Sequence, residues 1–500
     1  MNHSLVPIKN ALISVSDKTN LEPLCRKLHE WGVTIFSTGG TARFIESLGV
    51  PIRLVEELTQ TPEMLEGRVK TLNPRIFGGI LARRDHPGDL SEIEAFKLTL
   101  FDLVVVNFYP FQDHFGKSTE EQTSFIDIGG PSLVRAASKN HRWVTVLSSP
   151  NDYSDFLSEA SPHQGVELSF RFKMAKKSFL RVSQYDRSIF GEWEKSDFPQ
   201  LIDLSQQKVL RYGENPHQAG AWCGSPDWQV LQGKEISFNN LLDSEAACQL
   251  VADFSEGALA IIKHNNPCGV AWGTDPTAEL FKRALDSDSK SAFGGIVATN
   301  KAIDEASALL IREIFLEVIA SPFFEPGALK ILADKKNLRL IQWPHPRFHK
   351  FEIKAAMGGW LVQERNGLGV NPEFRLMTSG PSLSPSDREE MRGAWRICKH
   401  VRSNAIVLVK NQRTVGIGAG QMSRIDSLEM ALQKAKGQCD GAILASDAFF
   451  PFRDSIDRLK GLGIKAVLQP GGSQRDQDVI DACRELEIPL YFTGERHFRH

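Results

Sequence analysis

The sequence predicts an α/β protein of at least two domains, the first of which is built on a parallel sheet. From the N-terminus, short apolar runs alternate with segments of helical periodicity, a rhythm typical of βαβ units. The chain has 500 residues, whereas single cores seldom grow beyond about 250 to 300 residues. Two or more full-sized cores are therefore expected.

The elements of the first domain follow one another closely. Four apolar runs predict buried strands: ALISVSD (11–17), VTIFST (33–38), FDLVVVNFYPF (101–111) and WVTVLSS (143–149). A helix between the first two strands has its apolar residues on one face: Leu21, Leu24, Leu28 and Trp31. GGTARFIESLG (39–49) predicts a second helix, and residues 167–193 predict a long one. This order indicates a parallel sheet covered by helices.

A polar segment with few strand-forming residues, EKSDFPQLIDLSQQK (194–208), is the best candidate for a linker. We therefore expect one domain over residues 1–197 and another over 198–500. In the second domain, GALAIIKHNNPCG (257–269) and GQCDGAILASDAFFPF (437–452) each place an apolar strand before a polar loop. This similarity suggests two related halves.

Composition excludes several classes of protein. The 59 basic and 61 acidic side chains nearly balance and no long basic run occurs, so neither nucleic acid nor a membrane surface is an expected partner. The seven cysteines are scattered without paired spacing, which predicts neither a disulfide framework nor a zinc finger. The N-terminal residues lack the apolar core of a signal peptide, and no run of about eighteen apolar residues occurs. A cytoplasmic protein is expected.

Two predicted strand ends in the first domain carry small hydroxyl residues and glycines. SVSDK follows the first strand, and STGGT follows the second and opens a helix. Glycines let the backbone approach a ligand, and free N–H groups at a helix start attract an anion. Together the motifs predict a phosphate pocket made by Ser14, Ser16, Lys18, Ser37, Thr38, Gly39, Gly40 and Thr41. The alternative is structural: Thr41 as a helix cap and the glycines as a turn.

Further charged and polar residues follow at turns and strand ends of the same domain: Arg68, Lys70, Tyr109, Asp127 and Lys139. Taken singly, each fits a structural role. Together, a lysine, a tyrosine and an aspartate at successive sheet ends can stabilise a developing oxyanion and steer a proton without a cofactor.

In the second domain, the stretch IIKHNNPCGVAWG (261–273) predicts a buried strand that delivers Lys263 and His264 to a loop. A histidine followed by Pro-Cys is also found in zinc-dependent nucleobase deaminases. Those enzymes need a glutamate two residues after the histidine and a Pro-Cys-x-x-Cys motif. Here Asn266 and Ala271 stand at those positions. The zinc hypothesis is therefore disfavoured.

A dozen motifs, in order along the whole chain, resemble the AICAR transformylase/IMP cyclohydrolase family of bifunctional purine-biosynthesis enzymes. They are SVSDK, STGGTA, EMLEGRVKTLNP, GGILAR, NFYPF, IDIGGPSLVRAASKNH, RYGENPHQ, KHNNPCG, SAFGGIVATN, SNAIVLVKN, GIGAGQMSRIDS and SDAFFPFRDSID. The resemblance implies a methylglyoxal-synthase-like N-terminal domain followed by two cytidine-deaminase-like α/β subdomains. It also implies formyl transfer from 10-formyltetrahydrofolate to AICAR, ring closure of formyl-AICAR to IMP, no divalent metal, and a homodimer with transformylase sites between subunits.

The resemblance assigns roles to residues of the first domain. Ring closure passes through an oxyanion, and the matching motifs assign its stabilisation to Lys70, Tyr109, Asp127 and Lys139. The resemblance assigns the nucleotide phosphate to Ser16, Lys18, Ser37, Gly39, Gly40 and Thr41, and it implies Arg68 as a further substrate contact. Many relatives have histidines where this chain has Asn73 and Phe77, so no proton transfer is assigned to those two positions.

The resemblance also assigns residues of the second domain. His264 is expected to accept a proton from the AICAR amine, since histidine changes its charge near neutral pH. Lys263 is expected to supply charge or a proton to the departing folate nitrogen, and Asn404 to orient the formyl group. The expected nucleotide contacts are Arg211, Tyr212, Arg424, Phe449 and Arg496. The expected folate contacts are Phe449, Pro451, Phe452 and Asp454.

GIGAGQMS (416–423) lacks the spacing of a phosphate-binding fingerprint, and we interpret it as a turn that brings backbone near the substrate.

A regulatory nucleotide-binding protein is a second functional hypothesis for the whole chain. Such a protein would need neither the first domain's group of Lys70, Tyr109, Asp127 and Lys139 nor an attached transformylase region.

Overall fold

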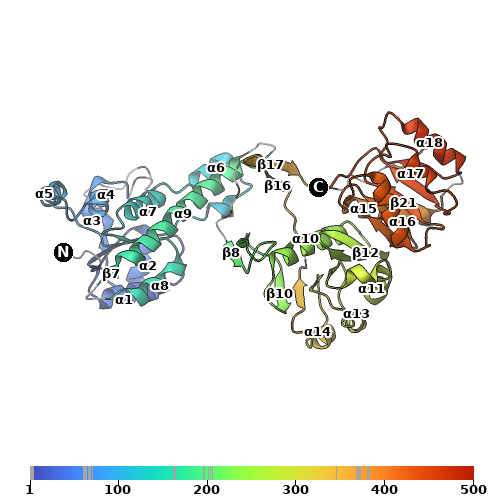
Figure 1. The fold of residues 1–500 in the computed structure, drawn as a ribbon. Coiled ribbons are helices and arrows are strands. Elements are labelled where there is room, and N and C mark those ends of the chain that lie inside the picture. Colours follow the sequence, from blue (N-terminus) through green and yellow to red (C-terminus); the bar gives the residue numbers. More distant parts are fainter. Residues whose placement is uncertain are drawn as a thin grey trace. The chain divides into compact units, whose positions relative to one another are not determined.

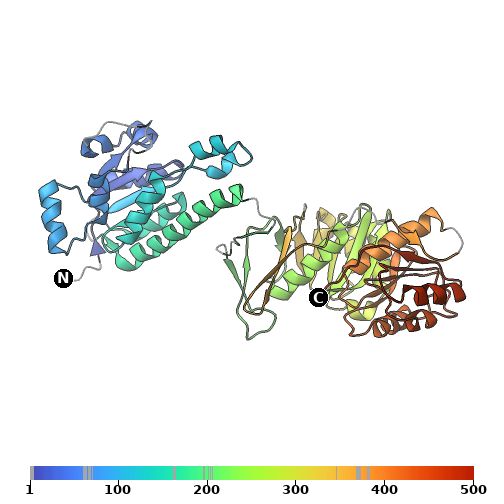
Figure 2. The same cartoon turned by 90° about the horizontal axis from the view of Figure 1, so that it is seen from above.

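A computed structural model describes residues 5–59, 65, 69, 71–161, 165–194, 198–200, 202, 204, 207–344, 346–367, 373–379 and 383–500. The chain forms two compact units, Met1–Ile202 and Asp203–His500, coloured blue to green and green to red in Figures 1 and 2. Of the predicted linker, residues 195–197, 201, 203, 205 and 206 lie outside the described residues. The prediction was wrong for its last two residues, because Gln207 and Lys208 belong to a strand.

The first unit has a five-stranded parallel sheet in the order β4-β3-β2-β5-β6, as the βαβ rhythm predicted. The strands of this sheet are β2 (Asn10–Ser14), β3 (Thr34–Ser37), β4 (Arg53–Leu54), β5 (Leu103–Val106) and β6 (Thr145–Leu147). Two further strands of the unit, β1 (Leu5–Val6) and β7 (Val166–Glu167), pair with each other. Its α-helices are α1 (Leu21–Glu30), α2 (Gly39–Ser47), α3 (Val55–Thr59), α4 (Pro74–Leu81), α5 (Pro87–Phe96), α6 (Thr119–Ser124), α7 (Gly129–Lys139), α8 (Tyr153–Glu159) and α9 (Leu168–Trp193).

Burial explains why these segments form these elements. Every residue of β5 is buried, as expected for a parallel strand covered on both faces. On α1, Leu21, Leu24 and Leu28 are fully buried, which confirms the predicted apolar face. The 26-residue helix α9 packs along α7 and β6, so the long predicted helix is confirmed within one residue.

The second unit contains a twelve-stranded mixed sheet in the order β10-β15-β14-β13-β11-β12-β20-β19-β21-β22-β23-β18. The strands of this unit are β8 (Gln207–Leu210), β9 (Gly220–Cys223), β10 (Gln229–Gln232), β11 (Gly257–Lys263), β12 (Asn266–Gly273), β13 (Ile296–Thr299), β14 (Val318–Ser321), β15 (Arg339–Gln342), β16 (Phe351–Ala356), β17 (Gly359–Glu364), β18 (Arg375–Leu376), β19 (Ile406–Lys410), β20 (Arg413–Gly418), β21 (Ile443–Ser446), β22 (Ala466–Gln469) and β23 (Leu490–Phe492). The α-helices are α10 (Phe238–Ala252), α11 (Thr277–Leu285), α12 (Ser289–Ala292), α13 (Glu305–Ile311), α14 (Pro326–Leu332), α15 (Pro385–Lys399), α16 (Arg424–Ala435), α17 (Asp454–Asp457) and α18 (Asp476–Glu485).

The sheet is an internal repeat. In each half, a helix leads into an antiparallel hairpin, and two parallel strands follow on the other side of the first hairpin strand: α10, β11–β12 and β13–β14 in one half, α15, β19–β20 and β21–β22 in the other. The halves meet where β12 pairs with β20. The suggestion of two related halves is confirmed, although the two segments that suggested it are not equivalent: β11 corresponds to β19, whereas β21 corresponds to β13. Both compared segments contain a short buried strand, and sequence pattern alone does not distinguish successive strands.

Glycines allow close packing of strand against helix at equivalent places. A Cβ on Gly269 of β12 would lie 1.9 Å from the carbonyl oxygen of Ala284 in α11, and one on Gly416 of β20 would lie 2.1 Å from that of Ala431 in α16. A Cβ on Gly418 would lie 1.8 Å from the carbonyl oxygen of Ser427. Two of the glycines in GIGAGQMS are therefore strand residues under α16, and the expected turn begins only after Gly418.

Candidate functional site

The predicted phosphate motifs lie at the carboxyl edge of the parallel sheet in the first unit. The segments after β2, β3 and β5 meet there, and the strand order reverses around the central β2, which is where open α/β sheets bind ligands. Gly39 begins α2 at a φ of 56°, and the buried Thr38 hydroxyl just before it has no hydrogen-bond partner within the described structure.

Two of the predicted phosphate residues are used inside the fold. The Thr41 hydroxyl donates to the Val15 carbonyl at 2.9 Å and accepts from the Val15 N–H at 3.0 Å. The Ser37 hydroxyl donates to the Ile13 carbonyl at 2.8 Å. Both side chains are buried. Ser16, Lys18 and the glycines thus remain as the more accessible members of the predicted set.

Asn107, directly after β5, is a residue of this edge that the sequence motifs did not single out. Its Oδ1 accepts from the N–H groups of Ser16 and Asp17 at 2.7 and 2.9 Å, and its Nδ2 donates to the Asp17 carbonyl at 2.7 Å. The loop after β2 is therefore held by Asn107 from one neighbouring strand and by Thr41 from the other. The sequence feature that could have identified Asn107 is its position directly after a run of apolar residues that forms a buried strand.

The structure brings Tyr109 and Asp127 together. The backbone N–H groups of Gly130 and Tyr109 donate to the Asp127 carboxylate, and the Asp127 N–H donates to the Tyr185 hydroxyl at 2.8 Å. Burial raises the pKa of Asp127, and the two backbone donors only partly offset that effect. The Tyr109 side chain is 56% exposed.

The other predicted members of this group are placed differently. Lys139 is exposed at the C-terminal end of α7, whereas Asp127 precedes its N-terminal end. An 11-residue helix is about 16 Å long, so these two residues are not brought together within the chain. Arg68 and Lys70 lie outside the described residues.

The two departures from the family pattern have structural roles. Asn73 caps α4, because its side chain accepts from the Arg75 N–H at 2.9 Å. Phe77 packs against the core of the first unit.

In the second unit, Lys263 and His264 stand at the end of a hairpin. β11 ends at Lys263, and β12 begins at Asn266, so only His264 and Asn265 form the turn. The predicted loop was wrong for residues 266–269, which belong to β12. Pro267 is tolerated in this strand because the register shifts between Ile261 and Ile262, and Pro267 pairs at that irregularity.

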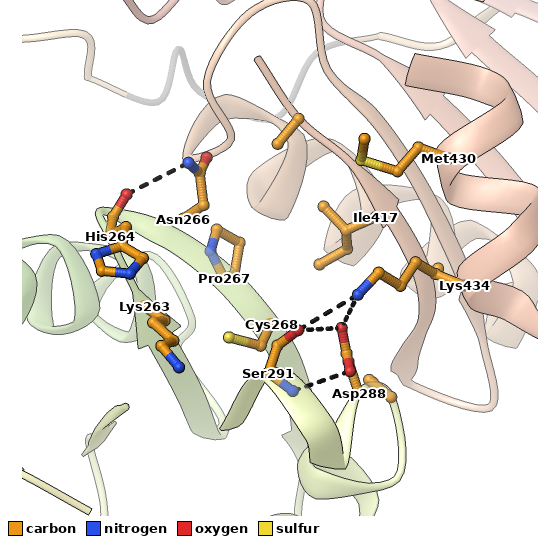
Figure 3. A pocket seen from close by; sticks show the side chains of 13 residues that line it. Lys263, His264, Asn266, Pro267, Cys268, Asp288, Ser291, Ile417, Met430 and Lys434 are labelled. Atoms are coloured by element: carbon orange, nitrogen blue, oxygen red, sulfur yellow. Dashed lines mark hydrogen bonds and ion pairs between the residues drawn. The ribbon is translucent and has the colours of Figure 1, made fainter. Parts of the chain in front are cut away.

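A cavity of about 220 Å³ opens beside this turn, between β11–β12 and α16 (Figure 3). Lys263, His264 and Cys268 line it from the first half of the repeat. Lys434 of α16 forms an ion pair with Asp288 across the cavity, and Ser291 donates to the same carboxylate at 2.6 Å. The cavity is therefore walled by both halves of the repeat.

A hydrogen bond fixes the position of one side chain of the cavity wall, and burial fixes the protonation state of another. The Lys263 ammonium group donates to the Phe293 carbonyl at 2.8 Å. Burial raises the pKa of Cys268 to about 12, so this thiol is protonated at neutral pH and is no nucleophile. Within the described residues, no three His, Cys, Asp or Glu side chains are arranged to hold a metal ion.

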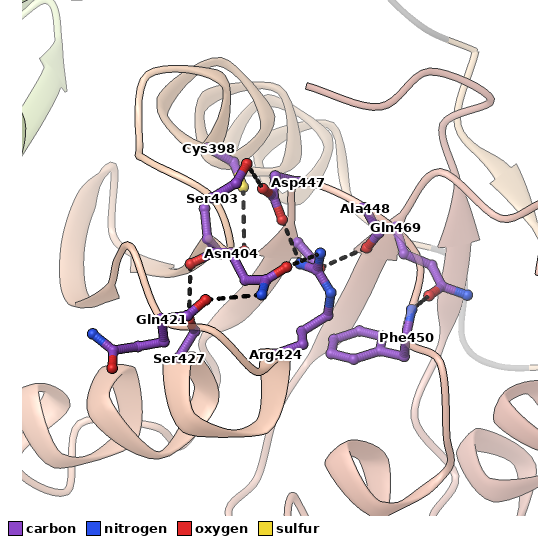
Figure 4. A network of polar contacts seen from close by, with 12 residues as sticks. Cys398, Ser403, Asn404, Gln421, Arg424, Ser427, Asp447, Ala448, Phe450 and Gln469 are labelled. Atoms are coloured by element: carbon purple, nitrogen blue, oxygen red, sulfur yellow. Dashed lines mark hydrogen bonds and ion pairs between the residues drawn. The ribbon is translucent and has the colours of Figure 1, made fainter. Parts of the chain in front are cut away.

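Asn404 and Arg424 form one network with Asp447 (Figure 4). Arg424, the first residue of α16, donates to the Asn404 side-chain oxygen at 2.8 Å and forms an ion pair with the buried Asp447. The Asn404 amide nitrogen donates to the carbonyls of Gln421 and Met422 at 2.9 and 3.2 Å. Asp447, directly after β21, lies in the motif SDAFFPFRDSID, but the sequence analysis assigned it no role.

The remaining predicted substrate contacts lie on loops and at the chain end. Arg211 lies over the Tyr212 ring at 4.7 Å and donates to its hydroxyl at 2.9 Å. Arg496 lies over Phe498 at 4.7 Å. Phe449 and Phe452 are 36% and 50% exposed in the loop between β21 and α17, together with Pro451, and Asp454 begins α17.

The chain consists of two α/β units, and each gathers polar side chains at the end of a buried strand, as enzymes do. A family model described as "AICARFT/IMPCHase bienzyme" matches residues 137–434, and one described as "MGS-like domain" matches residues 20–132. The chain belongs to the AICARFT/IMPCHase bienzyme family.

Similar proteins agree with this assignment over nearly the whole chain. The "Bifunctional purine biosynthesis protein PurH" of Prochlorococcus marinus (strain NATL1A) is 44% identical, with 98% of this chain and 99% of the relative covered. That of Microcystis aeruginosa is 45% identical with the same coverage, and that of Persephonella marina is 44% identical over 98% of this chain and 100% of the relative. Among solved structures, "Crystal structure of ForH" matches at 33% identity and a TM-score of 0.34, covering 37% of this chain and 99% of that one.

The chain is accordingly a bifunctional enzyme of purine biosynthesis, with AICAR formyltransferase and IMP cyclohydrolase activities. The formyltransferase activity implies a folate formyl donor. No helix in the described ranges is both long and apolar enough to cross a bilayer.

Proposed function

We propose that the cavity of the second unit is the site of formyl transfer and that the sheet edge of the first unit is the site of ring closure. The observation that carries this assignment is the hairpin turn, which places Lys263 and His264 together on the wall of a cavity. Each unit then holds one of the two activities.

Formyl transfer requires help at both ends of the reaction. The amine of AICAR is a poor nucleophile, because its lone pair is delocalised toward the carboxamide, so it must lose a proton as it attacks the formyl carbon of 10-formyltetrahydrofolate. His264 accepts that proton. Lys263 supplies positive charge or a proton to the folate nitrogen that leaves. Asn404, held in place by Arg424, orients the formyl group.

The three arginines proposed as substrate contacts of this unit differ in whether a carboxylate already balances their charge. Arg424 is already balanced by Asp447, so it serves to position Asn404. Arg211 and Arg496 are exposed, and neither forms an ion pair within the described part of the chain; they are the better candidates for the nucleotide phosphate, with Tyr212 and Phe449 beside the base. Phe449, Pro451, Phe452 and Asp454 provide aromatic surface and a carboxylate for the folate.

Ring closure joins the carboxamide nitrogen of formyl-AICAR to its formyl carbon, after which water leaves. Tyr109 and Lys70 stabilise the oxyanion that forms. Asp127, whose pKa burial raises, takes part in moving the proton. Ser16, Lys18 and the start of α2 at Gly39 hold the nucleotide phosphate, as helix N-termini do. Arg68 and Lys139 are kept as proposed contacts on the resemblance alone.

Several broader properties belong to the same proposal. The two halves of the large sheet are cytidine-deaminase-like subdomains that have no zinc site, and neither reaction requires a divalent metal. The active form is a homodimer in the cytoplasm, where seven free cysteines would stay reduced.

The decisive experiment supplies AICAR and 10-formyltetrahydrofolate and measures tetrahydrofolate and IMP, with and without EDTA. We expect His264→Ala to lower the rate of formyl transfer by about 10² to 10⁴-fold and Lys263→Ala to lower it at least as much. Both variants should still cyclise supplied formyl-AICAR at the wild-type rate. Retained formyl transfer in both variants, or loss of both activities together with thermal stability, would assign the pair a structural role.

A further inference from the structure

The turn that carries His264 has an unfavourable backbone conformation. His264 and Asn265 have φ angles of 53° and 61°. This left-handed region is sparsely populated by residues other than glycine, because the Cβ atom approaches the backbone. Two consecutive residues there, neither of them glycine, require support from their surroundings.

The support comes from Asp243 in the middle of α10. Its Oδ1 accepts from the Asn265 N–H at 2.7 Å, and its Oδ2 accepts from the His264 N–H at 3.2 Å. Both turn N–H groups are therefore bound by one carboxylate. Because α10 packs on β11 and β13, the turn is fixed to a helix of the core.

A second contact fixes the far side of the turn. The Asn266 Oδ1 accepts from the Arg402 N–H at 2.9 Å. Arg402 lies two residues before Asn404, so this bond ties the hairpin to the segment that carries the formyl-orienting amide. The position of His264 relative to Asn404 thus depends on the conformation of a two-residue turn.

The corresponding turn in the other half of the repeat is held by a carboxylate in the same way but contains no histidine. Asn411 and Gln412 form the turn between β19 and β20, with φ angles of 53° and 54°. Glu390 of α15 accepts from the Gln412 N–H at 3.1 Å, and the Asn411 N–H also donates to it. A carboxylate from the preceding helix is therefore the common means by which this fold holds a left-handed hairpin turn.

We propose that Asp243 is a positioning residue for formyl transfer, which holds the His264–Asn265 turn in its left-handed conformation and so keeps the imidazole at the cavity. This inference rests on the proposed role of His264 as proton acceptor. Asp243 takes no part in the chemistry itself.

The test uses a glycine to replace the carboxylate's function. Asp243→Ala removes both acceptors, and we expect kcat for formyl transfer to fall by about 10²-fold, the loss that a displaced catalytic group produces, with little change in KM for AICAR. Glycine adopts positive φ without steric cost. Asp243→Ala/Asn265→Gly should therefore recover most of the lost kcat, although it restores no charge.

Two controls make the result specific. Glu390→Ala removes the matching carboxylate from the other turn; it should lower the thermal midpoint as Asp243→Ala does but leave formyl transfer intact. Ring closure by the first unit controls for the amount of active protein in each assay, and the thermal midpoint reports the integrity of the second unit. If Asp243→Ala prevents folding, Asp243→Asn, which keeps one acceptor oxygen, is compared with Asp243→Asn/Asn265→Gly in the same way.

Several outcomes would overturn the inference. They are wild-type kcat in Asp243→Ala, failure of the glycine to restore kcat, an equal loss of formyl transfer in Glu390→Ala, or a shifted pH profile that the glycine does not correct. His264→Ala separates this inference from the proposed function. If His264→Ala retains formyl transfer, the proposed function fails; if it is inactive while Asp243→Ala is normal, only the positioning role fails.

Discussion

Asn107 uses its whole amide group to hold the loop after β2, with three hydrogen bonds to the backbone of Ser16 and Asp17. This loop carries Ser16 and Lys18, two of the proposed phosphate ligands. Asn107 therefore fixes the backbone that carries the Ser16 and Lys18 side chains before the nucleotide arrives, which reduces the ordering cost of binding.

Asn107→Ala should raise KM for formyl-AICAR in the ring-closure assay by about tenfold, equivalent to about 1.4 kcal/mol of lost binding free energy. Formyl transfer by the second unit should not change. The control is Asn10→Ala, since Asn10 at the opposite end of β2 also bridges backbone, donating to the Leu100 carbonyl at 2.9 Å. An unchanged KM in Asn107→Ala, or an equal rise in Asn10→Ala, would contradict the prediction.

Single residues show where sequence patterns stop being informative. The STGGT motif predicted the turn from β3 into α2, because glycine and hydroxyl residues after a strand indicate a tight turn into a helix. It could not tell that the Thr41 hydroxyl is bound to Val15, since that contact joins residues 26 positions apart. Asp243 was missed for the same reason: it lies on an ordinary helix, and its partners come 21 and 22 residues later.

At the scale of elements, local apolar runs predicted the βαβ order of the first unit because its central strands are largely buried: every residue of β5 and β6 and the middle three of β2. The same reasoning was less successful for the β11–β12 hairpin. Pro267 and Gly269 are typical of loops, yet both lie in β12. The bulge that accepts Pro267 and the helix α11 that requires Gly269 are tertiary features, which a local pattern does not contain.

The ends of α10 and α15, one helix from each half, are joined by a buried polar cluster. Asp253 after α10 bonds to the His400 Nε2 at 2.5 Å and to the Lys399 ammonium at 2.7 Å. Burial lowers the pKa of His400 to about 4, and burial also lowers the pKa of His497, whose ring lies 4.8 Å from that of Trp395, to about 4.

This cluster predicts a loss of stability in acid. An unfolded histidine has a pKa of about 6.5, so between pH 6.5 and about 4 the unfolded chain binds protons that the folded chain does not. Each such histidine contributes a slope of about 1.4 kcal/mol per pH unit to the free energy of unfolding, which falls as the pH falls. Denaturant unfolding of the second unit at pH 7.0 and 4.5 measures this slope. His400→Gln should make it shallower, and an unchanged slope would exclude His400 as a source.

At the scale of the whole molecule, the two compact units, each with its own proposed site, predict that the two reactions can be divided between different molecules. His264→Ala and Asp127→Asn should each fail to convert AICAR to IMP when assayed alone. An equimolar mixture should convert it, because formyl-AICAR released by one variant can diffuse to the other. The measurement is IMP formation over time, and a mixture as inactive as its components would show that the intermediate must pass within one molecule.

The packing of α15 against β12 has a consequence for how the protein is made. Trp272 is fully buried, and Gly393 of α15 lies so close to it that an added Cβ would be 2.2 Å from the ring. Gly393 is translated 121 residues after Trp272 (393 minus 272), a delay of roughly 6 to 24 s at about 5–20 residues per second. During that interval the nascent chain presents an uncovered indole and the unpaired edge of β12 at the ribosome. We therefore expect the first half of the repeat to complete its packing only after α15 and β20 have emerged.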